Sequence, residues 1–336
     1  MKASLLPGES SSVETCQSIF LILPSDPNAK SIPVDDGGRG LFVNHGRRSA
    51  DNIPMKIALI QQQPTADLAR NVRRGLAALE EAAMAGADLV VYPELAFTPF
   101  YPQHRAGPNV LELAEPIPGP TSEAFREAAR RHGVVVVLNL YERDHDRAFD
   151  TSPVIDADGA LLGRTRMMHI TDYEGFYEQG YYTPGDTGAP VYDTAAGRIG
   201  VAICYDRHYP EYLRALALGG ADLVVVPQAG ALGEWPVGLF EAELQVASFQ
   251  NGYFMALANR VGREEVLEFA GASFVTNPFG QVVAQAPEQE ELILYADLDL
   301  GQCEASSARR LFFQHRRPDQ YRGGAVGVDE VSYFGF

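Results

Sequence analysis

From Met55 onward, short continuous apolar runs alternate with segments in which apolar residues recur at helical spacing. A continuous run, with no polar alternation, is typical of a strand that is buried on both faces of its sheet. Such runs occupy residues 56–61, 87–92, 134–140, 197–205, 221–227, 253–259, 272–277 and 292–298. Helical spacing together with helix-ending glycines predicts helices over residues 68–85, 121–131, 210–218 and 237–250. The alternation predicts a single α/β domain over residues 55–300.

The two ends of the chain differ from this central part. Residues 1–54 are rich in proline, glycine and serine and show no sustained period, which predicts a poorly structured N-terminal extension. Met55 is then either the original start or the point where a loosely attached arm joins the domain. Residues 301–336 are more basic and aromatic, and we expect them to form a C-terminal tail at a subunit interface. Residues 278–280 (Pro-Phe-Gly) separate the last two apolar runs and predict a hairpin turn.

Charge and cysteine content narrow the functional classes. The chain holds 27 Lys and Arg against 44 Asp and Glu, a net charge of −17, which disfavours nucleic acid and anionic membrane surfaces as partners. Three scattered cysteines are too few for a disulfide framework or a four-ligand zinc site, so we expect a reduced, cytoplasmic compartment. No apolar run approaches the roughly 18 residues that a membrane span needs.

Cys204 lies at the end of a predicted buried strand, just before a turn and the helix that begins near Pro210. A sharp, rigid corner of this kind can present a sulfur to a pocket and aim backbone N–H groups at a developing oxyanion. The alternative is a buried structural cysteine, which is the commonest fate of this residue type. Cys16 and Cys303 show no comparable context, and we expect them to be bystanders.

Glu94 favours the nucleophile interpretation. It follows another buried strand, at the carboxyl end where α/β sheets place their sites, although a lone glutamate there can also be a solvated or capping group. A thiol with a pKa near 8.5 is only slightly ionised at neutral pH, so a nucleophilic cysteine needs a nearby base. Glu94 and Cys204 together therefore suit a base–nucleophile pair.

The chain resembles the nitrilase, or carbon–nitrogen hydrolase, superfamily over nearly all of residues 55–321. The cysteine motif at residues 200–211 is closest to that of N-carbamoyl amidohydrolases of the β-ureidopropionase kind. Each remaining motif is weak alone, but their order along the chain is specific to the family. They are residues 92–94 (Tyr-Pro-Glu), 141–144 (Tyr-Glu-Arg-Asp), 182–186 (Tyr-Thr-Pro-Gly-Asp), 197–200 (Gly-Arg-Ile-Gly), 250–252 (Gln-Asn-Gly), 258–262 (Ala-Asn-Arg-Val-Gly), 271–274 (Gly-Ala-Ser-Phe) and 316–321 (Arg-Arg-Pro-Asp-Gln-Tyr).

The resemblance implies an α-β-β-α sandwich that assembles as a homodimer or larger homo-oligomer and uses no metal and no cofactor. By position, Cys204 is the implied nucleophile and Glu94 the general base. Glu178 matches the family's second glutamate, which orients the base and the incoming water. The backbone N–H of Tyr205 is the implied oxyanion donor.

Met167 departs from the family pattern. The family's lysine sits in an Arg-Lys-x-His stretch, and residues 166–169 read Arg-Met-Met-His here. The only lysines of the chain, Lys2, Lys30 and Lys56, do not fit the role. Losing one oxyanion donor typically costs about 10²–10³ in rate.

Two explanations for this departure remain open. In an extended strand His169 shares a face with Met167 and can donate to the substrate, whereas Arg164 and Arg166 reach the site only if the strand is irregular. In the other explanation Met167 fills the volume of the lysine, and activity is altered or lost.

The sequence therefore predicts a hydrolase of a non-peptide carbon–nitrogen bond acting through a cysteine thioester. The expected substrates are N-carbamoyl amino acids or amines, or aliphatic amides. Arg207 and His208 are candidates to hold a substrate carboxylate, although both can instead face a subunit contact. Aromatic residues of the predicted pocket, which packing into the core would explain equally well, are Phe97, Phe100, Tyr101 and Trp235. The alternative function is a catalytically impaired or non-catalytic binding protein.

Overall fold

The computed structural model describes residues 54–321, which all belong to one compact unit. The predictions for residues 1–53, including the one for Cys16, and for residues 322–336 lie outside this described part. Among residues 54–321 no helix has the length and apolar character needed to cross a membrane.

Two sheets of mixed direction form the centre of this unit. Strands β1, β2 and β3 of the first sheet are parallel neighbours, as are β10, β11 and β12 of the second. The first sheet has the order β17 (Leu292–Leu298), β1 (Met55–Gln61), β2 (Leu89–Val91), β3 (Val135–Val137), β5 (Arg147–Ile155) and β4 (Leu140–Asp144), with β6 (Leu161–Arg166) also paired to β5. The second has the order β16 (Val282–Gln285), β15 (Phe274–Thr276), β12 (Phe254–Asn259), β11 (Leu223–Gln228), β10 (Gly197–Val201) and β9 (Val191–Thr194).

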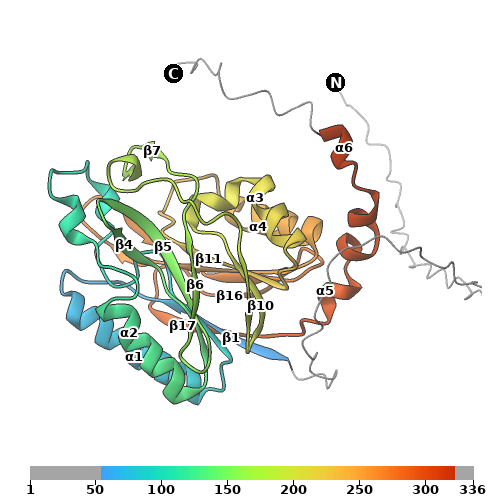
Figure 1. Cartoon of the computed structure of the whole chain (residues 1–336), viewed down its shortest axis with the longest axis horizontal. Coiled ribbons are helices and arrows are strands. Elements are labelled where there is room, and N and C mark those ends of the chain that lie inside the picture. The colour runs from blue at the N-terminus through green and yellow to red at the C-terminus, as the bar shows by residue number, and fades with distance from the viewer. Residues whose placement is uncertain (1–53, 322–336) are drawn as a thin grey trace, which may run out of the picture. The chain divides into compact units, whose positions relative to one another are not determined.

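Helices cover the outer face of each sheet. Helices α1 (Leu68–Met84) and α2 (Pro120–His132) pack on the first sheet, and α3 (Pro210–Leu218) and α4 (Leu239–Asn251) pack on the second. Figure 1 shows the two pairs on opposite sides of the strands. The unit is therefore the predicted four-layer α-β-β-α sandwich.

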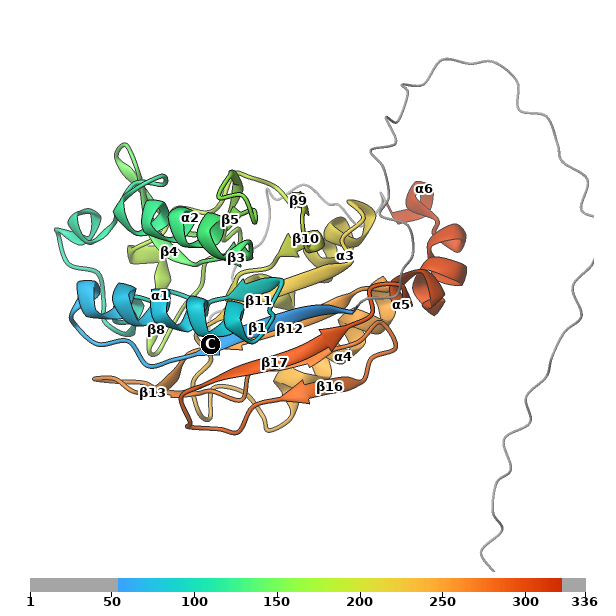
Figure 2. The ribbon, with the colours of Figure 1, turned by 90° about the horizontal axis from the view of Figure 1, so that it is seen from below.

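Strand β1 shows why the apolar runs are continuous. Its alternate residues Ile57 and Leu59 lie in the core between the two sheets, whereas Ala58 and Ile60 lie in the core beneath α1 and α2. All four are buried, and burying one leucine-sized side chain stabilises a fold by about 1.5–3 kcal/mol. Figure 2 shows β1 beside β17, with which it pairs along its whole length in antiparallel register. The prediction of strands buried on both faces is confirmed.

Short elements connect and extend the layers. Two ribbons, β7 with β8 and β13 with β14, stand outside the main sheets, and the described chain ends in a series of short helices. The ribbon strands are β7 (Asp172–Tyr173), β8 (Phe176–Tyr177), β13 (Val261–Arg263) and β14 (Glu268–Ala270). The short helices are η1 (Tyr101–Gln103), η2 (Val110–Leu113), η3 (Glu178–Gly180), η4 (Cys204–His208), α5 (Gln302–Ala305), η5 (Ala308–Phe312), η6 (Phe313–His315) and α6 (Pro318–Tyr321).

Three local predictions are wrong. The strand predicted over residues 197–205 ends at Val201, so Cys204 begins the short helix η4 instead of ending a strand. The run 134–140 is divided between β3 and β4, because the buried amide of Asn139 bonds to neighbouring segments there. The turn at residues 278–280 connects β15 to β16, a strand the pattern missed, while β17 belongs to the other sheet.

Candidate active site

The structure brings together the cysteine and the two glutamates that the sequence singled out. Cys204 Sγ and one carboxylate oxygen each of Glu94 and Glu178 lie within 4.8 Å of one another, and all three residues are buried. Glu94 is the third residue after β2, Cys204 is the third after β10, and Glu178 begins η3. Each sheet thus delivers one residue from the carboxyl end of a parallel strand, where α/β sheets place their sites.

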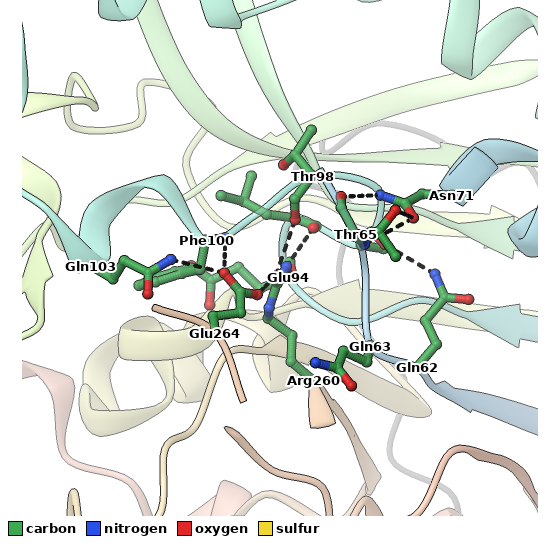
Figure 3. Close-up of polar contacts among 12 residues, drawn as sticks. Gln62, Gln63, Thr65, Asn71, Glu94, Thr98, Phe100, Gln103, Arg260 and Glu264 are labelled. Carbon is green, nitrogen blue, oxygen red and sulfur yellow. Dashed lines mark hydrogen bonds and ion pairs between the residues drawn. The ribbon is translucent and has the colours of Figure 1, made fainter. Parts of the chain in front are cut away.

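Both turns that carry these residues have unusual backbone conformations. Cys204 has φ +44° and Leu95, next to Glu94, has φ +43°, in the left-handed region that costs a non-glycine residue about 1–3 kcal/mol. The fully buried Arg260 holds the second turn, because its guanidinium donates to the carbonyls of Glu94 (2.9 Å) and Thr98 (3.0 Å). It also pairs with Glu264 (Figure 3). The arginine of the 258–262 motif therefore positions the glutamate.

The backbone after Cys204 offers a free hydrogen-bond donor. Within the part of the chain that the structure describes, the N–H of Tyr205 has no acceptor, whereas the N–H of Asp206 is bonded to the Ile203 carbonyl at 2.9 Å. An unpaired N–H next to a cysteine sulfur is suited to bind the oxyanion of a tetrahedral intermediate.

Burial disfavours the charged form of every acid in the site. It raises the pKa of Glu94 to about 8, with the nearby charge of Glu178 as the second cause, and burial also raises the pKa of Glu178. The pKa of Cys204 is raised by burial and then by the charges of Glu94 and Glu178. Within residues 54–321 neither carboxylate oxygen of Glu94 has a hydrogen-bond donor. A cluster of ionisable groups whose pKa values are raised together by burial is suited to proton transfer among its members.

Sequence reasoning missed two further residues beside Glu94. Asp150 of β5 is fully buried, and burial followed by the charge of Glu94 raises the pKa of its carboxyl. Asn139 Nδ2 donates to Asp150 Oδ1 (2.5 Å), and its Oδ1 accepts from the N–H of Leu95 (2.7 Å). Residues 151–152 (Thr-Ser) are polar as well, so the sequence around Asp150 gives no apolar strand signal by which this carboxylate could have been found.

Met167 is fully buried in the inter-sheet core that also contains Cys204. Its backbone is fixed on both sides, since its N–H donates to the Asp150 carbonyl (2.9 Å) and its carbonyl accepts from Gly185 (2.8 Å). A Cβ on Gly185 would lie 2.3 Å from the Arg166 carbonyl oxygen, so only glycine allows this approach. The Thr-Pro-Gly-Asp motif thus locks the segment in which the family has its lysine.

The contacts of His169 in the structure differ from the substrate contact that the sequence suggested. Its Nδ1 lies 2.7 Å from Asp206 Oδ1, and its ring stacks on that of Tyr209 with centroids 3.5 Å apart. Neither contact involves Cys204, so His169 ties its own segment to η4. Its role as a donor to substrate stays a prediction.

Arg207 and His208 share a protein carboxylate. Glu243 of α4 lies 3.2 Å from Arg207 Nε and 2.6 Å from His208 Nδ1. The Arg207 side chain is 1% exposed and also donates to the carbonyl oxygen of Cys204 at 3.0 Å. The structure therefore bonds Arg207 to the Cys204 backbone and to Glu243, while its role in holding a substrate carboxylate stays a prediction.

The aromatic candidates divide into two groups. Phe97 and Phe100 are fully buried in aromatic clusters, the first against Tyr92 and the second against Phe176. Trp235 is half-buried, with its ring edge-on to that of His208 at 5.2 Å. Tyr101 is half-buried and lies 6.0 Å from Tyr141 between ring centroids. Phe97 and Phe100 are thus core residues.

The second described cysteine makes a contact of its own, and its role as a bystander stays a prediction. Cys303 is buried, its Sγ donates to the Asp222 carbonyl at 3.3 Å, and burial raises the pKa of its thiol to about 12.

The donor set at the site also has the chemistry of a metal centre. One thiolate and two carboxylates are ligands that zinc accepts, with a fourth position left for water. The resemblance predicts no metal, and the same three groups suit acid–base and nucleophilic chemistry without one.

Comparison with known proteins identifies the family of the chain. The family model described as carbon–nitrogen hydrolase matches residues 56–308. An N-carbamoylputrescine amidase from Solanum lycopersicum is 32% identical over 280 residues, which cover 79% of this chain and 93% of that protein. A carbon–nitrogen hydrolase structure from Helicobacter pylori G27 has a TM-score of 0.75 and 29% identity, covering 80% of this chain and 97% of the other.

A variant of the amidase from Nesterenkonia sp. AN1 gives a further structural match. Its TM-score is 0.69 at 25% identity, covering 83% of this chain and 99% of the other, and it carries the acetamide moiety of fluoroacetamide on its active-site cysteine. The chain described here belongs to the carbon–nitrogen hydrolase family.

Proposed function

We propose that this protein hydrolyses the carbon–nitrogen bond of a small N-carbamoyl amine or aliphatic amide through a thioester on Cys204. The observation that carries the proposal is the meeting of Cys204 Sγ with the carboxylates of Glu94 and Glu178 within 4.8 Å. Cys204 is the nucleophile, Glu94 the general base and Glu178 the residue that positions Glu94 and water. The unpaired N–H of Tyr205 is the oxyanion donor.

The reaction divides into two halves. Cys204 Sγ attacks the substrate carbonyl carbon while Glu94 accepts the thiol proton, and Glu94 then gives this proton to the leaving nitrogen as the carbon–nitrogen bond breaks. A water molecule, deprotonated by Glu94 and held by Glu178, attacks the thioester and restores the thiol. An amide yields a carboxylic acid and ammonia, and a carbamoyl amine yields ammonia, carbon dioxide and the amine.

Charges around the site favour a substrate whose far end is not a carboxylate. Glu243 already pairs with Arg207 and His208, the two residues that would otherwise attract one. A second carboxylate, Glu234, accepts from Tyr173 Oη (2.6 Å) and Trp235 Nε1 (3.0 Å), and its charge contributes to the raised pKa of Cys204. A neutral or cationic tail suits this surrounding better than an anionic one. The similarity to N-carbamoylputrescine amidases supports the same choice.

Met167 supports the competing function, a binding protein that has lost catalysis with the family's lysine. An ammonia-release assay separates the two. Wild type and Cys204→Ala are compared on N-carbamoylputrescine, N-carbamoyl-β-alanine and butyramide, with Cys303→Ala as the matched cysteine control. We expect turnover by wild type and Cys303→Ala, a preference for the carbamoyl amine, and none by Cys204→Ala. Ammonia release that survives Cys204→Ala, or no release by wild type from any of the three, would contradict the proposal.

We also propose that the protein forms a homodimer or larger homo-oligomer through the segment that follows Gly301. Leu311 and Phe312 of η5 are 53% and 37% exposed, and Phe312 contacts Phe249 of α4, which is itself 42% exposed. Contiguous exposed apolar residues of this kind are typical of interfaces. A sedimentation experiment that finds only monomers would contradict this assembly. The cytoplasmic localisation stays a prediction.

A further inference from the structure

The sulfur of Cys204 has a hydrogen-bond donor that the sequence did not reveal. Gln228 Nε2 lies 3.3 Å from Cys204 Sγ, and the Gln228 side chain is fully buried. Gln228 is the last residue of β11, the parallel neighbour of the strand β10 that leads to Cys204. The two strands therefore bring the amide and the sulfur together at one end of the second sheet.

Arg207 fixes which end of the Gln228 amide faces the sulfur. Arg207 Nη1 donates to Gln228 Oε1 at 2.9 Å and to the Cys204 carbonyl at 3.0 Å. A guanidinium can only donate, so the amide oxygen must turn toward Arg207 and the amide N–H groups toward Cys204. The positive charge on the oxygen side also polarises the amide and strengthens its N–H as a donor.

Other groups hold Arg207 in this position. Glu243 pairs with its Nε, and its guanidinium lies over the ring of Phe240, 4.7 Å from the ring centroid. The charge of Arg207 lowers the pKa of Cys204, against the raising effects of burial and of the surrounding carboxylates. Among residues 54–321, Arg207 Nη2 has no hydrogen-bond acceptor. The position of Arg207 is therefore not explained by hydrogen bonds to every nitrogen of its guanidinium.

We propose that Gln228, oriented and polarised by Arg207, stabilises the thiolate of Cys204 in a site where Met167 replaces the family's lysine. Gln228 is then a catalytic residue, since it contacts the reacting sulfur, and Arg207 is a positioning residue. The thiol proton still passes to Glu94, and the Gln228 N–H shares its hydrogen with a sulfur lone pair without transferring it. When the sulfur–carbon bond forms, the negative charge moves to the substrate oxygen and the Gln228 hydrogen bond weakens. This inference rests on the proposed role of Cys204 as nucleophile.

The test measures alkylation of Cys204 by iodoacetamide between pH 5 and 10, followed by mass spectrometry of the Cys204 peptide. The reagent reacts with the thiolate, so the rate reports the fraction ionised and needs no substrate. We expect Gln228→Met to raise the pH midpoint by about one unit and to slow alkylation at pH 7 about tenfold. The matched control is Gln245→Met, which removes a half-buried amide that donates to the Gly280 carbonyl, and its midpoint should equal that of wild type.

Two further variants keep the test decisive. Gln228→Leu also removes the N–H donor and adds no charge beside the sulfur, and it replaces Gln228→Met if that protein does not fold. Arg207→Lys keeps a positive charge but loses the planar fork, so its midpoint should lie between those of wild type and Gln228→Met. In each variant kcat/KM should fall at pH 7 and recover toward the wild-type value at high pH. A purely structural role would leave the midpoint unmoved.

The outcomes separate this inference from the proposed function. An unchanged midpoint in folded Gln228→Met and Gln228→Leu overturns the role of Gln228, even where Cys204→Ala abolishes turnover. Turnover that survives Cys204→Ala removes the proposed function itself, and the role of Gln228 falls with it.

Discussion

Two groups of carboxylates, one beside Arg166 and one beside Met167, differ in burial and in how their charge is compensated. Glu142 is buried like Glu94 and Glu178, whereas Asp144 is half-buried and Asp186 is exposed. On one side of the Arg166–Met167 peptide, Arg166 donates to both carboxylate oxygens of Glu142 (2.9 and 2.8 Å). It also reaches Asp144 (2.7 Å) and Asp186 (2.9 Å). On the other side, Met167 brings no charge to the acids around Cys204.

The pKa values record this difference. Hydrogen bonds to Arg166 lower the pKa of Asp144 and of Asp186, whereas burial raises the pKa of Glu94 and of Glu178. The cluster around Arg166 is a structural ion-pair network made from two family motifs, residues 141–144 and 182–186. Acids left uncompensated in a core cost stability and are typical of sites that move protons.

The strongest test of the comparison removes the proposed general base, Glu94. Glu94→Gln keeps the shape of the side chain but cannot accept the thiol proton, so we expect kcat/KM for ammonia release to fall by about 10²–10⁴. Asp144→Asn is the control from the compensated cluster, and its activity should stay near the wild-type value. Equal losses in both folded variants would contradict the distinction between the two clusters.

The same variant should show a pH-dependent gain in stability. The pKa of Glu94 is raised from 4.5 to about 8 on folding, so between these values the unfolded chain releases a proton that the folded chain retains. The contribution of Glu94 to stability is therefore full below about pH 4.5 and is lost as the pH rises toward 8. Glu94→Gln does not titrate, and its unfolding temperature relative to wild type should rise between pH 5 and 8. A pH-independent difference would contradict the raised pKa.

A substitution in the cluster around Arg166 should lower the stability of the fold and leave catalysis unchanged. Arg166→Met removes the bidentate partner of buried Glu142 and leaves Arg164, 2.7 Å away, as its remaining cation. Breaking a buried pair typically costs about 3–5 kcal/mol, and we expect a loss toward the lower end of this range. The matched control is Arg130→Met, which removes an exposed pair with Glu127 and should change stability little. Urea unfolding measures both. A loss in Arg166→Met as small as in the control would show that the network contributes nothing to the fold.

The sequence predicted the layers of the fold because strands buried on both faces leave a plain local signal. The apolar runs around Ile57 and Val224 alone indicate two covered sheets. Glu94, Glu178 and Cys204 were also predictable as a set, through the order of the family motifs. The end of the strand before Cys204 was not predictable. The run 197–205 stays apolar through the turn, and the composition gives no sign of the φ of +44° at Cys204.

The support around these residues depends on pairs that are distant in sequence. Gln228 contacts Cys204 across 24 positions, and Arg260 contacts the Glu94 carbonyl across 166. Asn139 joins Leu95 to Asp150 across two strands. Each residue alone is an ordinary polar side chain next to an apolar run, so only its tertiary partners give it a role. Local pattern carries no information about those partners.

The smallest effect is expected from restoring the lysine. Met167→Lys places an ammonium in the core cluster that holds Cys204, where it would compensate the charges of Glu94 and Glu178 as Arg166 compensates Glu142. Because Gln228 and Arg207 already support the sulfur in our proposal, we expect kcat/KM to rise by no more than about tenfold. The alkylation midpoint of Cys204 should fall at the same time. Met168→Lys, at the half-buried neighbouring position, should change neither quantity. The contrary result is a fall in kcat/KM in folded Met167→Lys with the alkylation midpoint of Cys204 unmoved. It would show that a charge at position 167 does not act on the acids around Cys204, and the comparison between the two clusters would fail.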